Sequence, residues 1–360
     1  MKHEKKQSLI GPLRLWALYL LGGVVFVTSC SKEGPEDTAP VKEIVVRASV
    51  PSASLTTSTS GCTKAVAEES SALSLYFVRS DETSSGTWGA YGAESLLAER
   101  SSGSGAQSLT FSTPQYYRTD GLGTRLAGWY PGGAPSSGEE SGAGYWDPTS
   151  GTVVWTIDGS VDILTAPMQT GSKTSDMGPF VFEHRLSQLQ FYLYAESEKA
   201  ASRWGRLVSV SVEGQRSRAT LSLSDVTEKS APVSFSGEAA SEFAVRDLSA
   251  LVAPVSKEQA VRAGLPVMIE PQSSPVQLTL AVETQEGGSD RVVLPQQVYP
   301  AGTVVRVYLK LGVEEILVEP ELSIDSWVPG SSHEVGTGSF AEPSLTVSGW
   351  DSGTETEVTY

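Results

Sequence analysis

Apolar and polar residues alternate along several short stretches of this chain with a period of two. In the stretch 43–50 (EIVVRASV), one face carries the four apolar residues Ile44, Val46, Ala48 and Val50. The same alternation recurs at 207–214, 275–284 and 303–312. It places Val208, Val210 and Val212 of the first stretch, and Val305, Val307, Leu309 and Leu311 of the last, on the inward face. Because successive side chains of a strand point to opposite faces, each stretch predicts a strand with one buried face and one solvent face.

Further strands are predicted at 71–78, 152–158, 179–184, 186–195 and 219–224. A helical period is scarce. It is clearest at 256–264 (SKEQAVRAG), where Ser256 and Gln259 form a capping box and Gly264 provides the stop. Many short strands separated by turns rich in Gly, Pro and Ser predict an all-β protein built from β-sandwiches.

The length of 360 residues suggests two domains. A new series of strands begins near residue 184, so we expect an N-terminal sandwich at 65–183 and a C-terminal sandwich at 184–340. Residues 30–64 would hold a spacer and the first strand, and residues 341–360 would form a tail.

The first 29 residues have the pattern of an export signal. Basic residues precede the uncharged run 15–27, which is too short for a membrane span of about 20 residues. This order predicts a secretory signal peptide, residues 1–29. The run ends in Val27-Thr28-Ser29-Cys30, which resembles a bacterial lipobox; a plain signal with an incidental cysteine is the alternative. We therefore expect acyl chains on Cys30 to anchor the protein in the outer membrane of a Gram-negative-type envelope.

The formal net charge of −16 excludes nucleic acid and anionic membrane surfaces as partners. Nucleic acid binding depends on Lys and Arg neutralising phosphates, and anionic membrane surfaces attract basic segments. The lipid must therefore provide the anchoring. Once Cys30 is acylated, Cys62 has no partner within the chain. It is either a tolerated small residue or the site of an intermolecular disulfide, so the cores depend on apolar burial.

Five stretches in a fixed order resemble the fimbrillin, or type V pilin, family of lipoprotein-derived fimbrial subunits. They are TKA (63–65), AGWYPGG (127–133), VDILTAP (161–167), FVFEHRLSQLQFYLYA (180–195) and the run 299–330 that ends in a strand, a turn, a strand and a Trp. The resemblance extends from the lipobox to about residue 338. It implies two tandem transthyretin-like β-sandwich domains, export as a lipoprotein and assembly into fimbriae at the cell surface.

In that family a trypsin-like protease cuts after a basic residue beyond the first strand, and a neighbouring subunit's terminal strand fills the groove left behind. The matching position here is Lys64-Ala65, with Arg47, inside a predicted strand, as the runner-up. The alternative is that Lys64 is an ordinary solvated loop lysine. A groove with unpaired backbone groups readily accepts another strand. A candidate donor is the tail, in which Leu345 and Val347 alternate with polar residues.

No local motif indicates an enzyme, and we expect no cofactor and no metal. His184 and His333 are too far apart in sequence for a local metal motif, and we interpret His184 as structural. The glycine pair in GLGTRLAG (121–128) lacks the strand and helix that flank a dinucleotide-binding loop, so it predicts a turn. Carboxylates contributed by different loops, as in glycosidases, would leave no local motif.

Nine tyrosines and tryptophans lie between residues 88 and 155. Core packing is one explanation. The other is stacking of exposed rings on host or bacterial glycans, for which Tyr145 and Trp146, beside a glycine-rich loop, are the best candidates because we expect them to be exposed. Two functions follow. The first is a fimbrial structural subunit or a tip or anchor adhesin, assembled by proteolytically triggered strand exchange. The alternative is a monomeric surface glycan-binding lipoprotein of a nutrient-uptake system.

Overall fold

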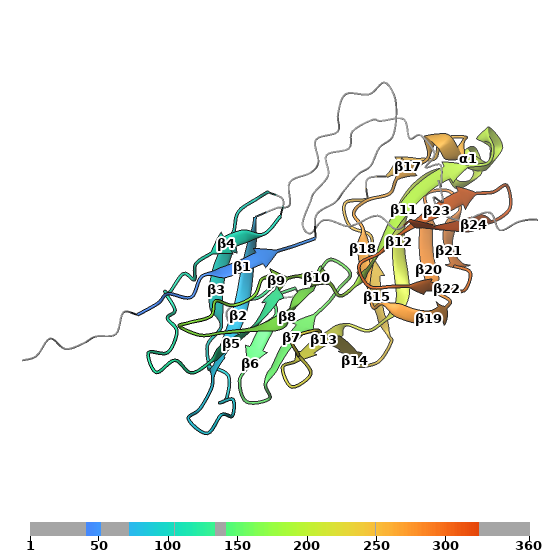
Figure 1. Cartoon of the computed structure of the whole chain (residues 1–360). Helices are drawn as coiled ribbons and strands as arrows, with labels where there is room; N and C mark the ends of the chain where they lie inside the picture. The colour runs from blue at the N-terminus through green and yellow to red at the C-terminus, as the bar shows by residue number, and fades with distance from the viewer. Residues whose placement is uncertain (1–40, 52–71, 104, 134–141, 249, 324–360) are drawn as a thin grey trace, which may run out of the picture. The chain divides into compact units, whose positions relative to one another are not determined.

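The computed structural model describes residues 41–51, 72–103, 105–133, 142–248 and 250–323. Within these residues strands dominate, and helical structure is limited to α1 (Glu198–Trp204) and the 3-10 turn η1 (Lys257–Gln259) (Figure 1). The sheets are open and pack face to face through shared apolar cores. The predicted all-β class with sandwiched sheets is therefore confirmed.

Three sheets involve the first half of the chain. The first has the order β4 (Gln107–Leu109), β1 (Val46–Ser49), β9 (Phe180–Val181). The second has the order β10 (Glu183–His184), β8 (Leu164–Gly171), β5 (Thr124–Tyr130), β2 (Leu73–Asp81), β3 (Leu96–Arg100). The third has the order β14 (Val233–Ser236), β13 (Arg218–Ser222), β7 (Thr152–Thr156), β6 (Tyr145–Asp147).

The five-stranded sheet that contains β2 packs on both faces. Phe77 of β2 belongs to the apolar cluster shared with β1, whereas its neighbour Val78 belongs to the cluster shared with β7 and β13. Adjacent residues of one strand point to opposite faces. The five-stranded sheet is therefore the middle of three packed layers.

Two further sheets are built from the second half of the chain, and their inward side chains belong to one apolar cluster. One has the order β17 (Val261–Arg262), β11 (Ser187–Ala195), β23 (Val304–Leu311), β24 (Ile316–Ser323), and β18 (Val267–Ile269) also pairs with β11. The other has the order β15 (Ser241–Ala244), β12 (Arg206–Gln215), β20 (Thr279–Thr284), β21 (Gly288–Val293), and β16 (Leu251–Val252) also pairs with β12. A two-stranded sheet joins β19 (Gln272–Val276) to β22 (Gln297–Tyr299).

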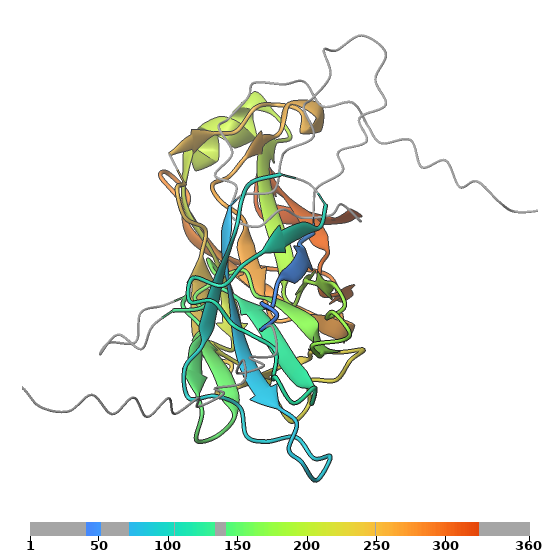
Figure 2. The ribbon, with the colours of Figure 1, turned by 60° about the vertical axis from the view of Figure 1, so that its left-hand side comes forward.

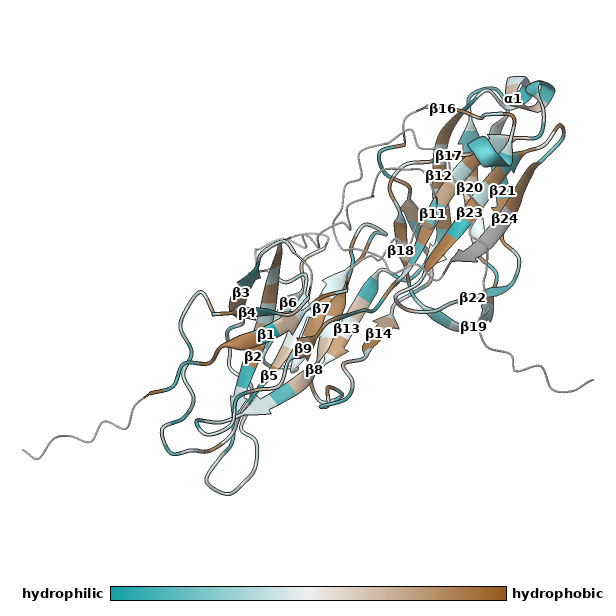
Figure 3. Cartoon of the chain, turned by 45° about the horizontal axis from the view of Figure 1, so that its top comes forward, coloured by the Kyte–Doolittle hydropathy of each residue, from teal (hydrophilic) through white to brown (hydrophobic). Residues whose placement is uncertain are grey.

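The period of two correctly identified buried faces wherever the ladder is regular. In β23 the predicted inward residues, Val305, Val307, Leu309 and Leu311, are fully buried, and apolar and polar residues alternate along β11 and β23 (Figure 3). In β12 the prediction was wrong at Val208, which is 43% exposed while Leu207 is buried. The pairing of β12 with β20 shifts register between Leu207 and Ser209, and such a bulge reverses which residues face the core.

The helix predicted at 256–264 is wrong apart from its first turn. Ser256 does cap that turn by accepting a hydrogen bond from the Glu258 amide, but Val261 and Arg262 then pair with β11. Pairing with a sheet overrides a weak helical preference. The true helix, α1, begins after Ser197, whose side chain accepts from Ala200 N, and its Trp204 donates to Gly312 O at 2.7 Å.

The domain division at residue 184 stays a prediction. Strands β13 and β14 follow that residue in the chain, yet β13 pairs along its whole length with β7, from Arg218 opposite Thr156 to Ser222 opposite Thr152. The third sheet therefore combines strands from both sides of the proposed boundary.

Candidate functional site

Strand β1 lies in the middle of its sheet. It runs antiparallel to β4, with Val46 opposite Leu109, and parallel to β9, with Ala48 opposite Phe180. Figure 2 shows the strand, in blue, at this position. Because both edges of β1 are hydrogen-bonded, its removal would leave unpaired backbone groups on β4 and on β9.

The predicted inward face of β1 is confirmed. Ile44, Val46 and Ala48 are completely buried, and Val50 is nearly so. They belong to an apolar cluster that includes Leu75 of β2 and the aromatic residues Phe77, Phe111, Phe180 and Phe182. We refer to β4, β9 and this cluster together as the β1 seat.

Phe77 lies at the centre of the β1 seat. Its ring makes edge-to-face contacts with Phe111, Phe180 and Phe182 at centroid distances of 5.5, 5.1 and 6.1 Å. Such edge-on pairs add stabilisation beyond the area that they bury. The floor of the seat is therefore built by strands β2 and β9 and the segments next to them rather than by β1 itself.

The segment that leads into β1 is also hydrogen-bonded. Ile44 N donates to Gln115 O at 2.7 Å, and Tyr117 N donates to Lys42 O at 2.9 Å. The Lys42 ammonium pairs with Asp176 at 2.7 Å, but this pair is largely exposed and contributes little. Burial raises the pKa of Tyr117, whose hydroxyl accepts a hydrogen bond from Met177 N. Segment 42–50 is thus held mainly by backbone pairing and apolar burial.

The structure places one of the two candidate processing sites. Arg47 lies within β1 opposite Ser108 with its side chain exposed, so its backbone is part of a ladder. A protease needs an extended, unpaired backbone. Cys30, Lys64 and Ala65 lie outside the described residues, as do Cys62, His333 and the tail 341–360.

The expectation that Tyr145 and Trp146 are both exposed was wrong for Trp146. Tyr145 is 46% exposed, but Trp146 is 7% exposed and donates from its indole nitrogen to Gly92 O at 3.0 Å. The two residues are neighbours in β6, so their side chains point to opposite faces. Trp129 and Trp155 are fully buried, which makes core packing the role of these tryptophans and removes the ring pair on which the glycan-binding alternative was based.

His184 is buried beside Asp162, with 3.0 Å between His184 Nδ1 and Asp162 Oδ1. This pairing agrees with the structural role expected of His184. In the portion of the chain that the structure describes, no group of three or more His, Cys, Asp or Glu side chains could hold a metal ion. None of the described helices is long and apolar enough to cross a membrane.

Comparison with known proteins identifies the relatives of this architecture. Residues 62–336, most of the chain, match the model of a family described as fimbrillin-like. A search of curated proteins gave no significant match. The family match starts after β1, so the first strand lies N-terminal to the part that the family model covers.

Similar solved structures include a cell adhesion candidate from Bacteroides ovatus ATCC 8483, with 12% identity and a TM-score of 0.50, covering 81% of this chain and 100% of that one. A second cell adhesion candidate, from Bacteroides uniformis ATCC 8492, has 16% identity and a TM-score of 0.47, with coverages of 78% and 97%. The tip fimbrial protein Mfa3 from Porphyromonas gingivalis has 11% identity and a TM-score of 0.39, with coverages of 80% and 100%. At this level of identity, the similarity to the Bacteroides ovatus structure is one of fold.

Proposed function

This chain belongs to the fimbrillin-like family, and from that membership we propose that it is a fimbrial structural subunit, or a tip or anchor adhesin, that is exported as a lipoprotein and assembled by proteolytically triggered strand exchange. Its partners would be other fimbrial subunits, a processing protease and the outer membrane. Its location would be the cell surface and the fimbrium.

The observation that carries the proposal is the β1 seat. The four-residue strand β1 completes the sheet between β4 and β9, and segment 44–50, which contains it, supplies four buried apolar side chains to the cluster beneath. The strand is joined to the rest of the chain on its C-terminal side by the long segment that leads to β2. A groove of this kind accepts any strand with the same alternation, because backbone hydrogen bonds provide affinity and alternate side chains fill the pockets.

We propose Lys64-Ala65 as the processing site. Cleavage there would separate β1 covalently from β2, and β1 would then be held only by its ladders and its buried side chains. Arg47 is the weaker candidate because the ladder that holds β1 also covers its backbone. Exchange of one apolar strand for another changes the free energy little. Irreversible cleavage would therefore make the exchange proceed towards assembly.

Acylation of Cys30 would hold the chain at the outer membrane until this cleavage. The released piece, residues 30–64, would keep the lipid, and the processed subunit would leave the membrane for the growing fimbrium. We propose the tail 341–360 as the donor strand that a sister subunit presents to the vacated seat.

Electron microscopy of cells that express the protein tests the assembly step. Wild-type protein should form surface fimbriae, whereas Lys64→Gln should leave the chain lipidated and unpolymerised. Arg47→Gln is the matched control and should assemble normally. Fimbriae of normal length from Lys64→Gln would refute processing at this site. A lipidated monomer from the wild type in every fraction would refute polymerisation itself.

A further inference from the structure

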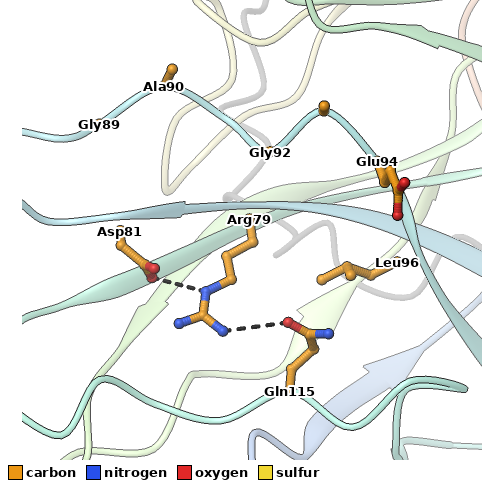
Figure 4. Close-up of a pocket in the computed structure, with 9 residues that line it drawn as sticks. Arg79, Asp81, Gly89, Ala90, Gly92, Glu94, Leu96 and Gln115 are labelled. Atoms are coloured by element: carbon orange, nitrogen blue, oxygen red, sulfur yellow. Dashed lines mark hydrogen bonds and ion pairs between the residues drawn. The ribbon is translucent and has the colours of Figure 1, made fainter.

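A shallow cleft of about 560 Å³ with both polar and apolar lining lies at the C-terminal end of β2. Its floor is formed by Arg79 and Asp81 of β2 with Gln115, and its wall by the segment 89–94. Figure 4 shows Arg79 reaching between Asp81 and Gln115, with Glu94 and Leu96 beyond them. Neither the family resemblance nor the strand-exchange proposal gives this cleft a role.

The floor of the cleft is a fixed hydrogen-bond network. Arg79 Nε donates to Asp81 Oδ1 at 2.9 Å, and Arg79 Nη1 donates to Gln115 Oε1 at 3.4 Å. Thr124 Oγ1 also donates to Asp81 Oδ1, at 2.7 Å. Within the described residues, Arg79 Nη2 and Asp81 Oδ2 make no hydrogen bond to the protein, so this ion pair keeps one charged donor and one charged acceptor for a ligand.

The wall of the cleft is held to β2 at both ends. Gly89 N donates to Asp81 O at 2.9 Å, and Gly92 N donates to Arg79 O at 2.8 Å. The buried Ser80, between Arg79 and Asp81 on β2, also donates from its hydroxyl to Gly89 O at 2.7 Å. Trp146, described above, donates to Gly92 O. A wall that is fixed before binding loses little conformational entropy when a ligand arrives.

Two aromatic rings at the wall, those of Trp88 and Tyr91, contact Arg125 of β5. Trp88 and Tyr91 flank the guanidinium of Arg125, which lies 4.8 and 4.9 Å from the two ring centroids. Tyr91 also donates from its hydroxyl to Met168 Sδ at 3.4 Å. Cation–π contacts of this kind are attractive and hold the rings and the guanidinium together. The aromatic residues of this segment therefore hold the cleft open rather than contact a ligand themselves.

We propose that this cleft binds a neutral saccharide. A sugar hydroxyl both donates and accepts a hydrogen bond, so a pair of neighbouring hydroxyls can donate to Asp81 Oδ2 and accept from Arg79 Nη2. The charges of Arg79 and Asp81 cancel and Glu94 adds a negative charge, which disfavours an acidic ligand. Leu96 and the exposed methyl group of Ala90 offer apolar surface to the C–H face of a sugar ring.

The site goes beyond the proposed assembly function and does not depend on it, because the cleft is complete in a single, unprocessed chain. Failure of strand exchange would leave saccharide binding intact, and failure of saccharide binding would leave assembly intact. Each proposal can therefore be overturned without the other.

The test is a glycan array probed with the purified chain. The array carries neutral mannose-, galactose-, glucose- and N-acetylhexosamine-terminated oligosaccharides beside sialylated and uronic acid-containing ones. We expect binding to a neutral glycan, and at least a tenfold loss of that binding in Asp81→Asn, which removes the free acceptor. Ala90→Trp should cause a similar loss by filling the cleft without breaking any hydrogen bond of the network.

Val252→Trp is the matched control, because it places the same ring on an exposed residue far along the chain and should bind as the wild type does. Thermal melting of each variant separates loss of the site from loss of the fold, and Ala90→Trp should melt as the wild type does. The proposal is overturned by no binding to any neutral glycan, by neutral binding that survives Ala90→Trp, or by binding restricted to the acidic glycans.

Discussion

Replacing Ile44 with alanine should lower the free energy of unfolding of the unprocessed chain by about 2–5 kcal/mol. Ile44 is completely buried in the β1 seat, and the substitution removes three carbon atoms. Their transfer back to water costs roughly 2.4 kcal/mol at about 0.8 kcal/mol per buried carbon. The cavity that remains adds to this loss, because the aromatic rings around Phe77 are packed against one another and relax only partly.

The matched control is Val45→Ala. Val45 is the next residue of the same segment, but its side chain points outward and is 43% exposed. Its loss should cost less than about 1 kcal/mol. Urea denaturation followed by tryptophan fluorescence measures both changes. Equal losses for the two variants, or a loss below about 1 kcal/mol for Ile44→Ala, would refute the assignment of the buried face.

Three further predictions concern the rest of the fold. A chain that ends at residue 184 should be unstable, because it lacks the strand that pairs with β7; adding residues 216–237 through a flexible linker should restore the native tryptophan emission. Gly159→Ala should destabilise by at least about 2 kcal/mol in a melting experiment, because Gly159 has φ +87° and an added Cβ would lie 2.8 Å from Phe243 Cβ. Burial raises the pKa of Tyr299 above the ordinary value of 10.0; the unfolded chain therefore loses this proton first, and stability should fall as the pH rises above 10.0. Tyr299→Phe should weaken that fall, and an unchanged alkaline profile would contradict the burial effect.

Local alternation was enough to predict the strands whose side chains divide between a core and water. It identified the buried residues of β1 and β23 because both pair without a shift of register. It failed at Val208, because a bulge depends on how the partner strand fits and leaves no mark in the sequence of β12. It failed at 256–264 because pairing with β11 outweighs the helical preference of that segment.

The candidate site was only partly predictable. The apolar face of β1 follows from its sequence, and β9 lies in the run 179–184 that predicts a strand. Its other neighbour, β4, is short and polar, so no pattern indicated it, and no pattern indicated that β1 pairs with either strand. The burial of Trp146 followed from its position in β6, which the sequence did not predict as a strand. The cleft brings together Arg79, Asp81, Glu94 and Gln115 from separate segments, and only the folded sheet places them side by side.

The most direct test of the central claim is the composition of assembled fimbriae from the cell surface. Mass spectrometry should find subunits that begin at Ala65, with no peptide from residues 41–51 retained in the polymer, because another strand occupies the β1 seat. Fimbriae whose subunits retain residues 41–51 in equal amount with the rest of the chain would contradict strand exchange.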